Sequence, residues 1–307
     1  MRLIRIENLL IIAVTQLCIK YLIFQPINTF SKFTPFLFFT SLLSTLLIAA
    51  AGYIINDYFD VKTDKINRPG SVVIDVVIKR RIAMILHVIF NIIGLILSLY
   101  IALVCHNIKL VLIQFVSILL LWFYSTHFKK QLLIGNIIVA TLTAIIPLIP
   151  LVYEYFLIGG IDPITYFFLG NLLTKLVTIS CGYAAFAFLT SLTREVIKDM
   201  QDYEGDVQTG CRTMPIVWGI ITSKVVSFFL ILITIGLLLT ACLKFYKDND
   251  YHSIYYVLIL LILPLFLLIF QTIRAKNSHD FKIASLILKI IMLLGIIFSF
   301  VITFWGH

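Results

Sequence analysis

Residues 33–64 read FTPFLFFTSLLSTLLIAAAGYIINDYFDVKTD, an apolar run that ends in a cluster of acidic residues. Between Lys32 and Asp57 the run carries no charge. A helix needs about 20 such residues to cross the roughly 30 Å of hydrocarbon in a bilayer. Helix is favoured over strand because the run is continuous and does not alternate between apolar and polar positions. The stretch therefore predicts a transmembrane helix that carries carboxylates where it leaves the membrane.

The same pattern recurs along the whole chain, which is 61% hydrophobic and only 13% charged. A soluble domain typically has about 25% charged residues. Further charge-free runs lie at 82–108, 110–128, 131–153, 176–193, 225–243 and 251–273. The runs after Glu7 and from Phe281 contain lysines but are also expected to span. We therefore predict an all-α polytopic protein of about nine transmembrane helices, with residues 1–307 forming one domain.

The distribution of basic residues predicts the orientation of these helices. If nine spans alternate, the N-terminus lies on the same side as the loops after the second, fourth, sixth and eighth spans. Few of the 24 Lys and Arg fall elsewhere: Lys32, Lys109, Lys244 and Lys247 on the other side, and Lys20, Lys175 and Lys289 within spans. Basic residues favour the cytoplasmic side, so the N-terminus is predicted there and the C-terminus opposite.

Three further expectations concern the first apolar run, the net charge and the location of the protein. The first apolar run is expected to be a retained helix rather than a signal peptide, because no small-residue cleavage site follows it. The net charge of +9 would suggest a nucleic-acid partner in a soluble protein, but here it is explained by topology, and no nucleic acid is expected. We expect an integral protein of the cell (inner) membrane whose active site faces the cytoplasm.

Two acidic segments on the predicted cytoplasmic side share one spacing. Carboxylates at i, i+3 and i+7 occur in both: Asp57, Asp60 and Asp64, and then Asp199, Asp202 and Asp206. This spacing places each set along one face of a helix. Like charges in this arrangement repel one another, so a bound cation is expected. Oxygen ligands without nearby Cys or His favour Mg²⁺, which commonly bridges carboxylates to substrate phosphates. Gly205 is expected to end the second helix, so that Asp206 turns towards the shared metals.

These segments supply the candidate site residues. The six aspartates are the candidate catalytic residues. The candidate metal ligands are Asn56, Asp60, Asp64, Asp199, Asp202 and Asp206. The candidate substrate-binding residues are Asn56, Arg68, Lys129, Lys130, Arg194, Lys198 and Arg212. Mixed acidic and basic groups at one membrane face suit a metal-bound diphosphate. Solvated acidic loops and ordinary positive-inside anchors are the alternatives, and for Lys79, Arg80 and Arg81 the anchor is preferred.

Three short motifs resemble those of the UbiA superfamily of intramembrane prenyltransferases. Residues 56–64 match NDxxDxxxD and are followed by Asn-Arg-Pro at 67–69. The second acidic segment matches the second motif, and the Tyr-Ser, Lys-Lys and Gly-Asn pairs at 124–125, 129–130 and 135–136 match a third signature. The resemblance implies helices around a central cavity beneath a cytoplasmic cap. It also implies that Mg²⁺ binds a prenyl diphosphate, which loses diphosphate to give an allylic cation that an acceptor attacks.

Acceptor identity is left open between two classes. Residues 194–216 look most like the branch of the superfamily that geranylgeranylates geranylgeranylglycerol phosphate, a membrane lipid. They are less like the branches that prenylate 4-hydroxybenzoate or dihydroxynaphthoate in quinone synthesis. However, Pro69 is followed here by Gly-Ser-Val-Val rather than the Leu-Pro-Ser-Gly common in the first branch. A secondary transporter is the alternative from another class, although transporters place ionisable groups near the midplane, where this sequence is expected to have only lone lysines.

Overall fold

The computed structural model describes residues 3–27, 33–67, 70, 72–158 and 163–305. Nine helical segments in this part of the chain are long and apolar enough to cross a membrane. This confirms the predicted number of spans, and the chain is an integral multi-pass membrane protein. The apolar runs form helices because a spanning segment must satisfy its own backbone hydrogen bonds in hydrocarbon.

The nine spans are built from the following helices. The first joins α1 (Ile6–Leu17) to the π-helical η1 (Cys18–Phe24), and the next three are α3 (Pro35–Asn67), α4 (Arg80–Val104) and η3 (Ile108–Leu110) with α5 (Val111–Thr126). The middle spans are α6 (Ile134–Ile158), α7 (Pro163–Gln201) and α10 (Ile220–Lys247). The last two are α11 (Tyr251–Tyr256) with η5 (Val257–Ile262) and α12 (Leu263–Arg274), and then α13 (Ser278–Trp305). Short helices lie between spans: α2 (Gln25–Ile27), η4 (Phe128–Lys130), α8 (Tyr203–Gln208) and α9 (Met214–Val217).

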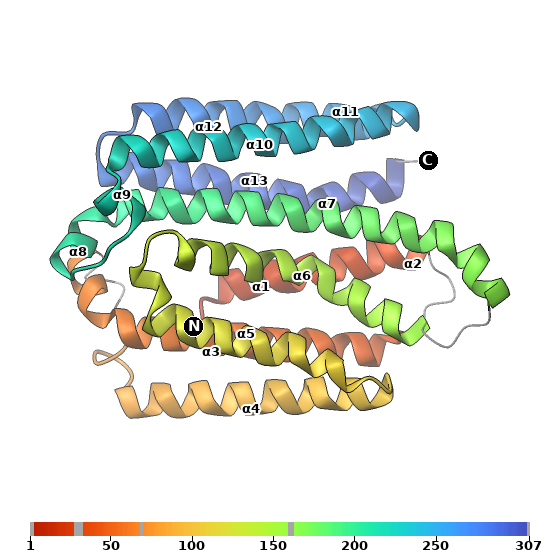
Figure 1. The fold of residues 1–307 in the computed structure, drawn as a ribbon, viewed down its shortest axis with the longest axis horizontal. Coiled ribbons are helices and arrows are strands. Elements are labelled where there is room, and N and C mark those ends of the chain that lie inside the picture. The colour runs from red at the N-terminus through yellow and green to blue at the C-terminus, as the bar shows by residue number, and fades with distance from the viewer. Residues whose placement is uncertain (1–2, 28–32, 68–69, 71, 159–162, 306–307) are drawn as a thin grey trace.

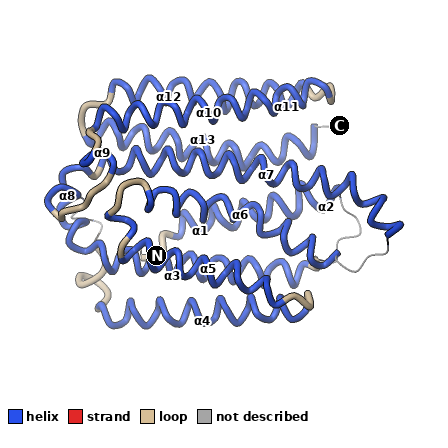
Figure 2. Tube along the Cα trace, viewed as in Figure 1, coloured by secondary structure: helices blue, strands red, loops and turns tan. Residues whose placement is uncertain are grey.

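The long helices run side by side along the longest axis of the molecule (Figure 1), and loops are confined to the two ends of the bundle (Figure 2). One end gathers the last turns of α3 and α7 together with α8 and α9, while α13 finishes at the opposite end (Figure 1). We call this whole end of the bundle, with its loops, the motif end, because it holds the acidic segments at residues 56–67 and 199–214. Because both acidic segments lie there, the fold brings together sequences more than 130 residues apart.

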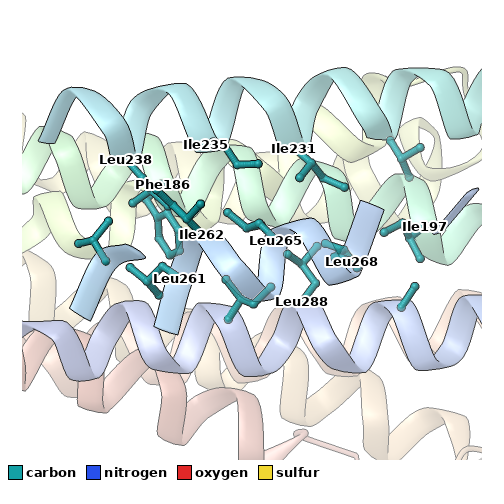
Figure 3. Packing of buried hydrophobic residues seen from close by; sticks show 14 of the residues in the cluster. Phe186, Ile197, Ile231, Ile235, Leu238, Leu261, Ile262, Leu265, Leu268 and Leu288 are labelled. Carbon is teal, nitrogen blue, oxygen red and sulfur yellow. The ribbon is translucent and has the colours of Figure 1, made fainter. Parts of the chain in front are cut away.

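Two parts of the packed interior illustrate how the helices meet. In the first, α3 packs against α4 and α5, and the Ser44 hydroxyl donates to the Gly94 carbonyl at 2.7 Å. A Cβ on Gly94 would lie 2.7 Å from Ile48, so this crossing depends on a small residue, as is common between membrane helices. In the second, α7, α10, α12 and α13 enclose a buried cluster that includes Phe186 and Leu288 (Figure 3).

Two of the three lysines within the spans form ion pairs, which corrects the expectation that they are lone charges. The Lys20 Nζ lies 3.3 Å from the Glu154 Oε2, and both side chains are at most 5% exposed. Lys289 pairs with Glu7 at 2.9 Å. A single charge inside hydrocarbon is costly, so such groups usually find a partner. The first pair could not be predicted from the sequence, because 134 residues separate Lys20 from Glu154.

Candidate functional site

The first acidic segment is a continuation of α3, as the spacing predicted. The helix runs without a break through Asn67, so its carboxylates project from the end of a membrane-spanning helix. Asn56 and Asp60 are one turn apart, and both are more than nine-tenths buried. The Asn56 Nδ2 donates to the Asp60 Oδ2 at 2.8 Å. This contact fixes the orientation of the amide, so that its oxygen remains available to a cation.

Lys129 supplies that cation in this structure. It is carried by η4, directly after α5, and its Nζ forms an ion pair with the Asp60 carboxylate and lies 3.5 Å from the Asn56 Oδ1. Burial disfavours the charged ammonium, but the Asp60 and Tyr124 groups outweigh burial and raise the pKa of Lys129 above its ordinary value. The ammonium is therefore charged at neutral pH and is placed between two of the predicted metal ligands.

Arg5 is a site residue that the sequence analysis missed. It precedes α1, and its Nη2 lies 2.6 Å from the Asp57 Oδ1, while its guanidinium sits 5.2 Å from the centre of the Tyr53 ring. Burial lowers the pKa of Arg5, but the Asp57 carboxylate more than offsets this and raises it overall. In the sequence, Arg5 counts only as one of the basic residues on the predicted cytoplasmic side, because nothing local indicates that the first span begins beside α3.

The second acidic segment is held by α6 and by its own helix. The Asn136 Nδ2, near the start of α6, donates to the Asp199 Oδ2 at 2.8 Å. Within α7, the Lys198 Nζ lies 3.1 Å from Glu195, and Arg194 lies 3.5 Å from the same carboxylate. The predicted phosphate contacts Arg194 and Lys198 therefore share one counter-ion, Glu195, which sequence reasoning left out of the site.

The second segment is not one continuous helix, and the break is not where it was expected. Helix α7 ends at Gln201, Asp202 lies in the turn, and α8 begins at Tyr203. Gly205 lies inside α8 rather than ending a helix, so that expectation is wrong. Asp199 and Asp206 consequently lie on different helices. The i, i+3, i+7 spacing places carboxylates on one face only while a helix continues, and the sequence did not reveal the turn at Asp202.

The remaining candidates lie around the same end of the bundle. The Lys130 side chain is exposed, and its carbonyl accepts a hydrogen bond from the backbone N–H of Arg212 at 2.9 Å. Asp64 is partly buried on α3 and Asp206 is buried on α8. The two segments meet where the Thr63 hydroxyl lies 3.4 Å from that of Thr209. Arg68 lies outside the described residues.

The donor set of this site fits a hard divalent cation. Across the described residues, no three Asp, Glu, His or Cys side chains converge on one point. Instead, Asp60, Asp57 and Asp199 are held by Lys129, Arg5 and Asn136, respectively. All the candidate ligands are carboxylate or amide oxygens, which Mg²⁺ prefers. Carboxylates and cationic side chains lie next to one another at this end of the bundle. This arrangement suits a metal-bound polyanion, because the carboxylates can bind the metal and the cationic side chains can bind the anion.

A profile of the UbiA prenyltransferase family matches residues 26–301. The chain belongs to the UbiA prenyltransferase family. This confirms the resemblance seen in the motifs, and it favours a prenyltransferase over the alternative of a transporter. The match begins just after the first span, Ile6–Phe24, and covers the other eight spans except the last residues of the ninth. Family membership therefore rests on most of the bundle rather than on one segment.

Relatives of this UbiA family member carry a common name. The digeranylgeranylglyceryl phosphate synthase of Saccharolobus solfataricus is 32% identical over 259 residues, which cover 83% of this chain and 82% of that protein. The synthase of the same name from Thermococcus sibiricus is 33% identical over 200 residues, which cover 64% of this chain and 62% of that protein. Over its shared length the chain is thus similar to synthases of this name.

Solved structures show the same fold. A structure concerning digeranylgeranylglyceryl phosphate synthase in membranes aligns with a TM-score of 0.64 and 25% identity, covering 97% of this chain and 96% of that one. A UbiA homologue from Archaeoglobus fulgidus bound to GPP and Mg²⁺ aligns with a TM-score of 0.57 over 97% of this chain and 98% of that one. Its identity to this chain is 18%, so this second likeness bears on the fold alone.

Proposed function

We propose that this chain transfers a prenyl group from a prenyl diphosphate to a glycerol phosphate lipid, geranylgeranylglycerol phosphate or a close relative, with Mg²⁺ as its metal. The observation that carries the proposal is the position of Lys129, whose ammonium is placed between the Asp60 carboxylate and the Asn56 amide oxygen. These are ligands for a metal, and the ammonium beside them is a partner for the phosphate oxygens that such a metal brings.

The residues that would hold the metal come from both acidic segments: Asn56, Asp60, Asp64, Asp199, Asp202 and Asp206. When bound there, Mg²⁺ would neutralise the charge that develops on the departing diphosphate. Lys129 would donate to diphosphate oxygens, and its present partner Asp60 would hold the metal. Lys198 and Arg194, which form ion pairs with Glu195 on α7, would provide the same kind of contact from the second acidic segment. The first segment therefore binds mainly metal, while the second binds metal and phosphate.

The reaction breaks the bond between the allylic carbon and the diphosphate oxygen, and the electron pair leaves with the diphosphate. The hydroxyl oxygen of the acceptor then forms a new bond to that carbon and loses its proton. Positioned cations stabilise the leaving group because they need no reorganisation as its charge develops. The apolar bundle below the site keeps water away from the allylic cation, which water would otherwise capture.

A lipid acceptor is favoured over an aromatic acceptor by the names of the relatives, which are glyceryl phosphate synthases. We also propose that the motif end faces the cytoplasm, since it carries most of the basic residues outside the spans. A cytoplasmic site would receive a water-soluble diphosphate headgroup while both isoprenoid tails stay in the membrane.

The test is prenyl transfer by the purified protein in detergent with Mg²⁺ and geranylgeranyl diphosphate. The acceptors are geranylgeranylglycerol phosphate, 4-hydroxybenzoate and dihydroxynaphthoate, and product mass identifies the reaction. Product from the lipid alone is the expected result, and product from either aromatic acid alone would overturn the lipid proposal.

Asp60→Asn and Asp202→Asn should each lower turnover at least about a hundredfold, whereas Asp75→Asn, which removes an exposed carboxylate at the same end, should not. Full activity of either site variant at limiting Mg²⁺ would refute the site.

A further inference from the structure

The side chain of Asn67 joins the end of α3 to the break between α7 and α8. Its Nδ2 donates to the main-chain carbonyl of Asp202 at 3.2 Å, and its Oδ1 accepts from the backbone N–H of Gly205 at 3.0 Å. We call these two hydrogen bonds the Asn67 bridge. They connect residues 135 and 138 positions apart, so they are set by tertiary structure alone.

The bridge satisfies a backbone group that α8 cannot satisfy itself. The first N–H groups of a helix have no partner within it, and the side chain of the N-cap residue usually accepts from the second or third of them. Asp202 is the N-cap residue of α8, and its side chain makes no such capping bond. Gly205 occupies the third position, and the Asn67 amide accepts from its N–H instead. Asn67 therefore caps α8 from a different helix.

Gly205 is the residue that makes room for this amide. A Cβ at that position would lie 2.3 Å from the Asn67 Oδ1 and 2.6 Å from its Nδ2, closer than real Cβ atoms approach any heavy atom. Gly205 is buried and has an ordinary helical backbone, so its conformation does not require glycine. The approach of the Asn67 side chain is therefore what a larger residue at this position would obstruct.

The bridge connects the two acidic segments that carry the candidate metal ligands. On α3, Asn67 follows Asp64 by three residues and Asp60 by seven, which places it on the same helical face. On the other side, the backbone groups that it binds belong to Asp202 itself and to the residue before Asp206. Since the bridge fixes these backbones to one another, it also sets the separation between the two sets of candidate metal ligands.

We infer that Asn67 is a positioning residue, which holds the two carboxylate rows at the spacing that a metal-bound diphosphate needs without touching the substrate itself. This inference rests on the proposed function for its consequence in catalysis. One part of the inference does not depend on activity. The change in stability caused by a methyl group at position 205 should depend on whether the Asn67 amide is present.

A cycle of variants measures that coupling in the ligand-free, full-length protein. Asn67→Ala and Gly205→Ala should each lower the thermal unfolding midpoint in detergent by about 3 °C or more. The double variant should be no less stable than Asn67→Ala alone, because the added methyl then occupies space that the amide has left. If the two decreases simply add, the methyl does not meet the amide and the inference is overturned.

A second measurement separates positioning from a purely structural role. In Asn67→Ala, the Mg²⁺ concentration for half-maximal rate at saturating donor should rise about tenfold, with a smaller loss of kcat. Asn107→Ala is the matched control, since it removes an amide that caps a helix at the opposite end, where it accepts from the Lys109 N–H at 3.1 Å, and it should leave the Mg²⁺ curve unchanged. A reduced kcat with an unshifted Mg²⁺ curve for Asn67→Ala would overturn its role as a positioning residue.

The two proposals can fail separately. If the wild-type protein transfers no prenyl group to any acceptor, the proposed function fails, while the thermal cycle still decides whether the bridge exists.

Discussion

Replacement of Lys129 by Met tests the exchange of partners on which the proposed mechanism depends. In the structure the ammonium neutralises Asp60, with 35% of the Lys129 side chain and 11% of the Asp60 side chain exposed. When metal and donor bind, Asp60 is expected to take the metal and Lys129 the diphosphate. Met keeps most of the length of the side chain and removes its charge, so the variant removes the phosphate contact and frees the carboxylate at the same time.

The expected magnitude follows from the kind of contact that is lost. A hydrogen bond to a charged group contributes about 1.5–3 kcal/mol. At about 1.4 kcal/mol for each factor of ten, kcat/KM for the donor should fall by roughly 10- to 100-fold. Removal of one member of an ion pair costs about 3–5 kcal/mol when the pair is fully buried and under about 1 kcal/mol at the surface. The partial exposure of Lys129 places its loss of stability between these limits, so the variant should fold.

The sign of the Mg²⁺ effect distinguishes this mechanism from a general loss of charge. Because the ammonium no longer competes for Asp60, the apparent affinity of Lys129→Met for Mg²⁺ should be unchanged or tighter while donor use is impaired. The assay is initial rate at varied donor with saturating Mg²⁺, and then at varied Mg²⁺ with fixed donor. Lys79→Met is the control, since it removes the same charge from an exposed position at the motif end. Weaker Mg²⁺ affinity with unchanged donor KM, or a loss of kcat/KM no larger than that of Lys79→Met, would refute the exchange.

Two further predictions concern the membrane-spanning part. Lys20→Met and Glu154→Gln should each lower the thermal midpoint more than the double variant does, because each single change leaves one buried charge without its partner, at a cost of about 3–5 kcal/mol. A double variant less stable than both single variants would show that the pair is net stabilising in itself. Reporter fusions should place the N-terminus in the cytoplasm and the C-terminus on the other side of the membrane, and reporters on the same side would contradict nine spans.

Much of the fold could be predicted from the sequence, because the forces that select membrane helices act locally. Each apolar run must satisfy its own backbone in hydrocarbon, so length and composition are sufficient to predict a span. The first acidic motif was equally accessible, since α3 continues unbroken through Asp57, Asp60 and Asp64. The spacing, the oxygen-only ligands and the family motifs together predicted a prenyltransferase, and the family match confirms that class.

The partners of the charged and polar groups were decided by the tertiary structure alone. Arg5 with Asp57, Lys20 with Glu154 and the amide of Asn67 with the start of α8 join positions 52, 134 and 135 or more residues apart. No periodicity encodes such a pair, because each depends on which helices pack side by side and on how each is rotated about its axis. The turn at Asp202 was hidden for the same reason, since the side chain that caps the helix after it comes from α3. Hydrophobic runs are a property of single segments, whereas the geometry of the site arises from the packing of several helices at one end of the bundle.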